Sequence, residues 1–131
     1  MKNTIILTSI LAVTAVSFAF MDSISPGNSK DYTECLVKYN SSWGDPCEHC
    51  TYSQDIFQLF FRNECEDHLD ALVAVQETDE TWTCTYQENI APQDTFAAYA
   101  CKGTGKFLRW ARKAGDRNTI FPTCKEVNES Y

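Results

Sequence analysis

Seven cysteines constrain this chain more than any other feature of its sequence. We take all of them as disulfide candidates: Cys35, Cys47, Cys50, Cys65, Cys84, Cys101 and Cys124. In an oxidising compartment, this density in a small protein predicts a framework of disulfide bonds. Because seven is odd, one thiol stays free, joins two chains into a homodimer or pairs with another protein. We expect Cys35 to be that residue, since it lies nearest to the N-terminal tail.

The start of the chain has the pattern of a secretory signal peptide. Lys2 is followed by an uncharged, largely apolar run, and small residues stand at Ser17 and Ala19. We therefore predict that residues 1–19 are a signal peptide, and that the protein is secreted and extracellular. An uncleaved membrane anchor is the weaker alternative, because hydroxyl residues dilute a run that is barely long enough to span a bilayer.

Three further segments follow from this prediction. Residues 20–30 are poor in large apolar residues and form a flexible tail or a short pro-segment. Residues 31–131 are expected to form a single disulfide-stapled domain. Within it, Asn40 and Asn128 begin sequons, and so they are glycosylation candidates in a secreted protein.

Local patterns predict a mostly α fold, with about three helices and one short strand or extended segment. Thr51 and Gln54 resemble a capping box, and the apolar spacing that follows favours a helix over residues 54–75. Residues 81–86 alternate in a way typical of a strand, with Trp82, Cys84 and Tyr86 on one face. A second helix is expected from Pro92 to Gly103, and a third over residues 104–114. Cys124 is expected to bind the tail back to the domain.

Charge is distributed unevenly along the chain. Residues 31–101 carry a net charge of −12, whereas residues 102–117 carry +5. The third predicted helix would place its basic residues on one face and Trp110 on the other. We take these residues as candidates for binding a partner or a surface: Lys106, Arg109, Trp110, Arg112 and Lys113. The favoured interpretation is that the basic face neutralises the acidic remainder, and contact with a membrane surface is the less favoured one. The acidic balance of the whole chain argues against nucleic-acid binding.

The motif Cys47-Glu48-His49-Cys50 allows two kinds of chemistry. A CxxC pair beside a histidine can act in thiol–disulfide exchange. Together with Cys65 and His68, the same two cysteines have spacings that a zinc ion would accept. Because secreted thiols are usually oxidised, we favour structural cysteines, and we expect no metal and no cofactor.

The sequence carries no catalytic triad, nucleophile elbow or phosphate-binding loop, so we expect no enzyme. We predict a secreted, cysteine-rich polypeptide that binds an extracellular protein or cell-surface receptor, as a signal, pheromone, toxin or effector does. The alternative is a small helical carrier of an apolar ligand such as a lipid, enclosed by aromatic residues. The lining of that carrier would be Phe57, Phe60, Phe61, Phe96 and Phe107.

Overall fold

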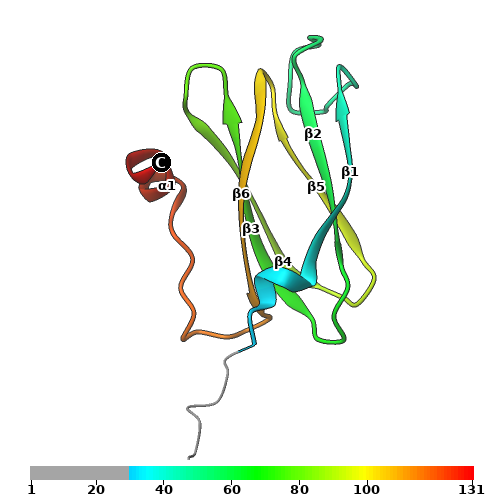
Figure 1. Cartoon of the computed structure of the whole chain (residues 1–131), viewed down its shortest axis with the longest axis vertical. Helices are drawn as coiled ribbons and strands as arrows, with labels where there is room; N and C mark the ends of the chain where they lie inside the picture. The colour runs from blue at the N-terminus through cyan, green and yellow to red at the C-terminus, as the bar shows by residue number, and fades with distance from the viewer. Residues whose placement is uncertain (1–29) are drawn as a thin grey trace, which may run out of the picture.

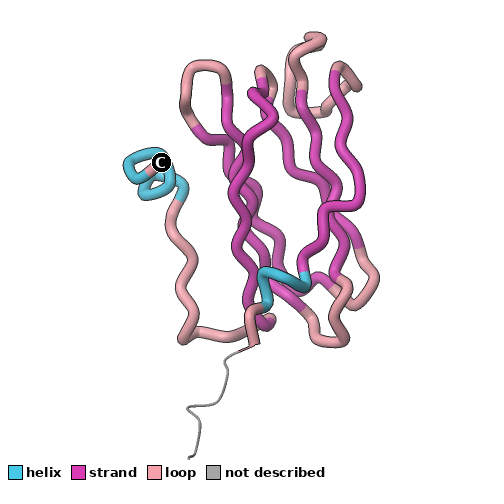
Figure 2. Tube along the Cα trace, viewed as in Figure 1, coloured by secondary structure: helices cyan, strands magenta, loops and turns pink. Residues whose placement is uncertain are grey.

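Residues 30–131 are described by the structure, a computed structural model, and they form a sandwich of two antiparallel sheets (Figure 1). Each sheet has three strands, in the orders β1-β2-β5 and β4-β3-β6. A short 3₁₀ helix precedes the first strand, and one α-helix follows the last strand (Figure 2). The elements are η1 (Tyr32–Cys35), β1 (Leu36–Trp43), β2 (Phe57–Asn63), β3 (Leu69–Glu77), β4 (Trp82–Ile90), β5 (Thr95–Ala100), β6 (Gly103–Lys113) and α1 (Cys124–Ser130).

This architecture contradicts the mostly α prediction. The segment predicted as the first helix contains β2 and β3, joined by the loop that carries Cys65. In β2 the buried side chains alternate with partly exposed ones, which is the period of a strand. Phe60 lies on the face away from the core, where its ring is 6.3 Å from that of Tyr39. Because Phe60 is apolar although it faces outward, the apolar positions of this segment had the spacing expected of a helix.

The second and third predicted helices are also wrong. Residues 91–94 turn the chain into β5, and Gly103 opens β6 instead of ending a helix. Gly103 sits so close to the core that a Cβ atom there would lie 2.4 Å from the Cβ of Phe57. The strand between residues 82 and 86 is confirmed and extends to Ile90, and Cys84 pairs across the sheet with Ala74.

The core fills the space between the two sheets. Its largest fully buried side chains come from both layers and include Leu36, Leu59, Phe61, Val73 and Val75. β3 is buried on both faces from Leu69 to Val75, because a second layer covers the outer face of its sheet. That layer is the C-terminal part of the chain, which explains why residues 71–75 of β3 are apolar without alternation.

The second layer is a small apolar cluster beneath α1. Val127 is fully buried against Ala74 and Trp82, and the ring of Trp110 packs at its edge. Asn128 fastens the helix to β4, because its side chain accepts a hydrogen bond from the Trp82 amide at 2.7 Å and donates one to the Trp82 carbonyl at 3.1 Å. We call residues 114–123, which lead from β6 to α1 across this face, the C-terminal strap.

Three disulfides confirm the predicted framework: Cys35–Cys65, Cys50–Cys101 and Cys84–Cys124. The third bridge binds the tail to β4, as expected of Cys124. The odd cysteine is Cys47, so the expectation that Cys35 is unpaired is wrong. Cys35 lies at the end of η1, where the chain enters β1 beside the loop after β2, and it is therefore placed against Cys65.

The predicted signal peptide, and all of the predicted tail except Lys30, lie outside the described residues. Between residues 30 and 131, no helix has the length and apolar character needed to cross a bilayer.

Candidate functional site

The five residues predicted to bind a partner all lie on β6, but not on one face of a helix. In the strand they alternate between two rows. Lys106, Trp110 and Arg112 point to the outer face of their sheet, toward the strap and α1. Arg109 and Lys113 belong to the row of Phe107, whose ring packs against Phe61 in the core.

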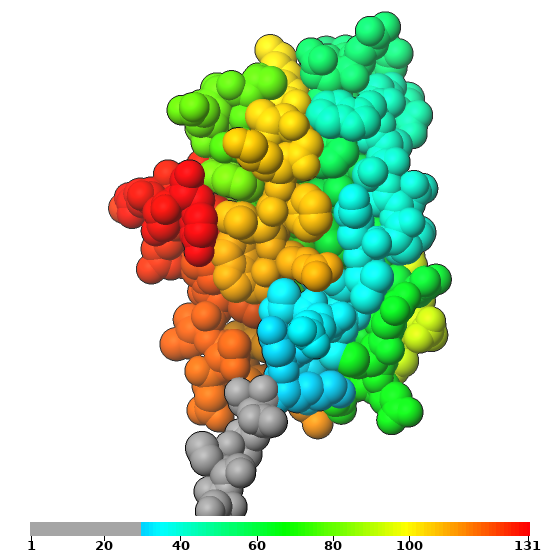
Figure 3. Space-filling model, viewed as in Figure 1, coloured from blue at the N-terminus to red at the C-terminus, as the bar shows by residue number. Residues whose placement is uncertain are grey.

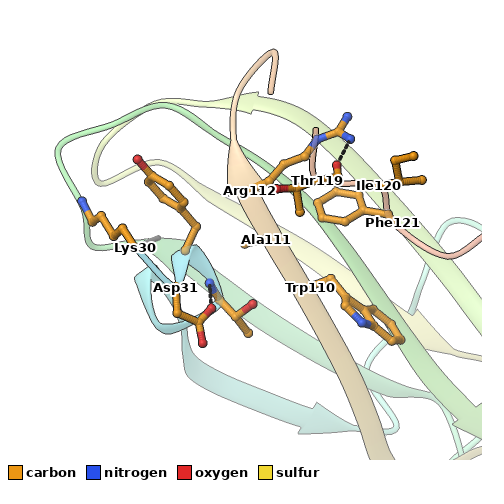
Figure 4. A pocket seen from close by; sticks show the side chains of 10 residues that line it. Lys30, Asp31, Trp110, Ala111, Arg112, Thr119, Ile120 and Phe121 are labelled. Carbon is orange, nitrogen blue, oxygen red and sulfur yellow. Dashed lines mark hydrogen bonds between the residues drawn. The ribbon is translucent and has the colours of Figure 1, made fainter. Parts of the chain in front are cut away.

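The outer row leads into a groove of about 420 Å³ (Figure 4). Residues 110–112 of β6 form its floor, the segment 30–33 forms one wall, and residues 119–121 of the strap form the other. We call it the strap groove. Trp110, Ile120 and Phe121 supply its apolar surface, and Ile120 is 84% exposed. Exposed apolar side chains around a concave surface are typical of binding sites.

Arg112 holds the strap groove in shape. Its guanidinium donates hydrogen bonds to the carbonyl oxygen of Thr119 at 2.7 Å and to a carboxylate oxygen of Asp70 at 3.3 Å. Asp70 is itself buried, and it also accepts from the amides of Asn89 and Gly115. Arg112 therefore positions the strap and is not free to bind a partner with its charge.

Arg112 also contacts two aromatic rings of the same region. It lies 4.6 Å from the centre of the Phe121 ring and donates to the hydroxyl oxygen of Tyr86 at 3.2 Å. Burial, followed by the negative charge of Asp70, raises the pKa of Tyr86 above its ordinary value. A tyrosine is protonated at neutral pH in any case, so the shift moves its ionisation further into the alkaline range.

Lys113, too, is engaged within the protein. Its ammonium group lies 3.3 Å from a carboxylate oxygen of Asp67, which also bonds Tyr32 and Lys30. Bonding to Lys113, and then to Tyr32, lowers the pKa of Asp67 below its usual range. Asp67 lies in the β2–β3 loop, so this ion pair connects the end of β6 to that loop.

A second group of cations lies where the edges of β1 and β6 meet. Lys38 has its ammonium group 5.7 Å from the centre of the Phe107 ring, and Arg109 donates to the carbonyl oxygen of Leu36. Lys106 lies on the same stretch of β6. Within residues 30–131, none of these three cations has an ion-pair partner. Lys106 belongs to the outer row of β6, so only the other two share a face, and we call Lys38 and Arg109 the cationic seam.

Trp43 marks one end of this seam. Its side chain is 52% exposed and lies over Gly105 of β6, where a Cβ atom would come within 3.4 Å of the indole ring. On its other side, the indole packs against Phe57 with the ring centres 4.4 Å apart. β1 and β6 lie side by side on the face shown in Figure 3.

The motif at Cys47 is not a closed CxxC pair, because Cys50 is bonded to Cys101. The ligands of the alternative zinc site are also separated. Cys65 is bonded to Cys35, and His68 is hydrogen-bonded to Asn89 at 3.0 Å. Cys47 itself is a partly buried thiol in the loop between β1 and β2.

The two sequons have different surroundings. Asn40 is exposed on β1, at the edge of its sheet, and its side chain accepts only from the neighbouring Ser41 amide. Asn128 uses its side chain to dock α1 onto Trp82. A glycan on Asn128 would remove one of its two N–H donors, so glycosylation remains a prediction with Asn40 as the suitable site.

The sequence predictions missed four residues of these surfaces: Lys38, Trp43, Ile120 and Phe121. Lys38 is one of only two basic residues between positions 31 and 101, and this isolation was a usable signal. Ile120 and Phe121 follow a polar turn and precede Pro122, so they belong to no helical or strand pattern. Two apolar residues outside any such pattern were a usable signal of an exposed apolar surface.

The chain was compared with protein-family models, curated proteins and solved structures, and nothing matches it in any of these comparisons.

Proposed function

We propose that this protein is a secreted binding module that recognises an extracellular macromolecule and carries out no catalysis. The observation that carries the proposal is the strap groove, in which Trp110, Ile120 and Phe121 present apolar surface on a rigid frame. The Cys84–Cys124 bridge and the Arg112 hydrogen bonds hold that frame. Exposed aromatic and aliphatic anchors on a preorganised surface are the main source of affinity at protein interfaces. The disulfides of so small a domain support an extracellular location.

The test uses fluorescently labelled mature protein on cells of the organism that produces it. We expect saturable binding at low concentration that excess unlabelled protein displaces. The variant Ile120→Asp should weaken binding by at least about tenfold, because it puts a charge into an apolar contact. Its fold should be unchanged, since Ile120 is 84% exposed.

The matched control is Tyr52→Asp, which also replaces an exposed large side chain with a carboxylate, at a site 68% exposed in the loop between β1 and β2. This variant should bind as the unmodified protein does. Binding that is not saturable, or that both variants weaken equally, would contradict the proposal.

Carriage of a small apolar ligand is the second candidate, and a specific feature favours it. On its other side, the strap bounds a second hollow of about 470 Å³, lined by Leu72, Tyr86, Phe121 and Pro122 among others. Of the phenylalanines first expected to line a cavity, Phe57 and Phe61 instead fill the core. A carrier should bind an apolar fluorescent dye with one-to-one stoichiometry, and Tyr86→Asp, at a lining side chain that is 46% exposed, should weaken this binding.

A further inference from the structure

Two aromatic side chains lie together on the outer face of the β1-β2-β5 sheet, the layer away from α1 (Figure 1). Phe60 is partly exposed in the middle strand, and Tyr39 is 46% exposed on the edge strand β1. Their ring centres are 6.3 Å apart, and the guanidinium carbon of Arg62 lies 5.3 Å from the centre of the Tyr39 ring. On β5, the residue opposite Phe60 is Ala97, whose methyl group is too small to cover the ring. We call Tyr39 and Phe60 the aromatic shelf.

A β-bulge brings the sequon at Asn40 to this shelf. The register of β1 with β2 runs through the pairs Lys38↔Phe61 and Asn40↔Phe60. Tyr39 is thus an extra residue in β1, and it shares its position opposite Phe60 with Asn40. Residues directly opposite each other in an antiparallel pair point to the same face, with their Cβ atoms about 4.5–5.5 Å apart. The Asn40 side chain therefore starts beside the Phe60 ring.

The side-chain nitrogen of Asn40 is free to carry a glycan. Asn40 is exposed, and within residues 30–131 its side chain makes one hydrogen bond, which its oxygen accepts from the Ser41 amide. Glycosylation replaces a hydrogen on the nitrogen, so it costs no contact that the fold uses. In the other sequon, the same nitrogen of Asn128 donates to the Trp82 carbonyl and helps to hold α1.

A sugar ring attached at Asn40 suits the aromatic shelf. One face of an N-acetylglucosamine ring consists mainly of C–H groups, and their partial positive charge is attracted to the negative face of an aromatic ring. Because such a sugar is bonded next to Phe60, it gives up little further translational freedom when it packs there. A separate partner or a second copy of the chain would lose that freedom in full. The position of the sequon thus favours the chain's own glycan as the occupant.

We propose that Asn40 is N-glycosylated and that the first sugar of the glycan packs on the aromatic shelf. In a secretory compartment, the Asn40 nitrogen forms a bond to the anomeric carbon of an oligosaccharide carried on a polyprenyl diphosphate. The bond from that carbon to the diphosphate oxygen breaks, the nitrogen loses one proton, and the lipid diphosphate leaves. The strap groove lies on the outer face of the other sheet, so the glycan would leave it open, and this proposal and the proposed function can fail separately.

The test uses the full chain expressed in secreting eukaryotic cells, with the glycan trimmed enzymatically to one N-acetylglucosamine. Every sample carries Ser130→Ala, which removes the second sequon and keeps the Asn128 side chain. Peptide mapping should place the sugar on Asn40. The reference is Asn40→Gln, which keeps an amide at this position but accepts no glycan. Compared with the reference, the sugar should raise the midpoint temperature of unfolding by about 3 °C or more, the shift that one favourable contact gives in a domain of about 100 residues.

Two further variants show whether this shift comes from the shelf. In Phe60→Thr, the sugar should raise the midpoint by no more than about 1 °C, because the ring beneath it is gone. Tyr99 is an aromatic residue on the same outer face, but it lies opposite Gln58 and stacks on His49 with the ring centres 5.4 Å apart. Tyr99→Thr is therefore the matched control and should keep the full shift. A shift of equal size in both variants would overturn the proposal.

A measurement on the chain with Phe60 intact covers the case in which Phe60→Thr does not fold. In NMR spectra of the glycosylated protein, we expect nuclear Overhauser effects between ring protons of the sugar and aromatic protons of Phe60 and Tyr39. Their absence would show that the glycan points into solvent and that the shelf is not its seat. An Asn40 that leaves the cell unmodified, or a dimer that buries Phe60, would likewise overturn the proposal.

Discussion

Asn63 is the polar residue on which the loops at one end of the sandwich depend. It is fully buried, and its side chain donates to the carbonyl oxygens of Asp67 at 2.8 Å and Ile90 at 3.0 Å. Its side-chain carbonyl oxygen accepts a hydrogen bond from the Cys65 amide at 2.9 Å. One side chain thus satisfies groups in two connections that are far apart in the sequence.

Replacing Asn63 with Ala should lower the free energy of unfolding by about 2–4 kcal/mol, because buried groups lose their partners and cannot reach water. Urea denaturation measures the change. Asn118→Ala is the control: that side chain is exposed, and we expect a change within about 0.5 kcal/mol. An Asn63 variant as stable as the control would show that the loops do not need these bonds.

At the scale of elements, the segment from β6 to α1 is held by a few contacts at its ends. Cys84–Cys124 joins α1 to β4, and Val127 fills the space over Ala74 and Trp82. The helix has only seven residues, too few to be stable in isolation. Its position therefore depends on the bridge.

The double variant Cys84→Ala, Cys124→Ala should lose about 3–4 kcal/mol of stability, the cost expected for opening a loop of this length. Release of α1 would uncover Trp82 and Trp110, so tryptophan emission should shift to longer wavelength before the sandwich unfolds. Simultaneous loss of all structure would instead show that the strap and the sandwich unfold as one unit.

The elements also show what the sequence could predict. The strand at Trp82 was predictable because aromatic and threonine residues alternate there. Three capping-box patterns occur, beginning at Thr51, Thr85 and Thr123, and only the one at Thr123 begins a helix. The pattern at Thr51 precedes β2 instead, because pairing with β1 and β5 outweighs a local preference for helix. The helical periodicity of residues 104–114 failed for the same reason.

For the candidate site, the sequence analysis predicted a helix with a basic face at residues 106–113, and the structure shows a strand there whose side chains alternate between two faces. A basic, tryptophan-containing segment on β6 was predictable from composition alone. Two of its cations form internal ion pairs, Arg112 with Asp70 and Lys113 with Asp67. Arg109 and Lys106 form none among residues 30–131. Asp67 lies in the β2–β3 loop and Asp70 in β3, more than 40 residues before the cations they bind, and the local sequence around those cations gives no sign of these contacts.

For the molecule as a whole, three bridges and one thiol predict a definite covalent state. Without reduction, the protein should gain one alkyl group from a thiol reagent, and peptide mapping should place it on Cys47. The measurement is intact mass before and after alkylation. A disulfide-linked dimer would show that Cys47 joins two chains. Three reactive thiols would mean that one of the three disulfides, such as Cys50–Cys101, is not formed.

The bridge at the end of the strap also decides what a protease can do to this protein. Arg117 is exposed in the strap, whereas Arg112 is bonded into the sheet beside Lys113, so trypsin should cut after Arg117. Cleavage there breaks the backbone before residues 118–131, but this fragment stays covalently attached through the Cys84–Cys124 disulfide. The nicked molecule would travel as an intact one until reductant is added. A protein built in this way can be cut in the strap and still keep the fragment attached.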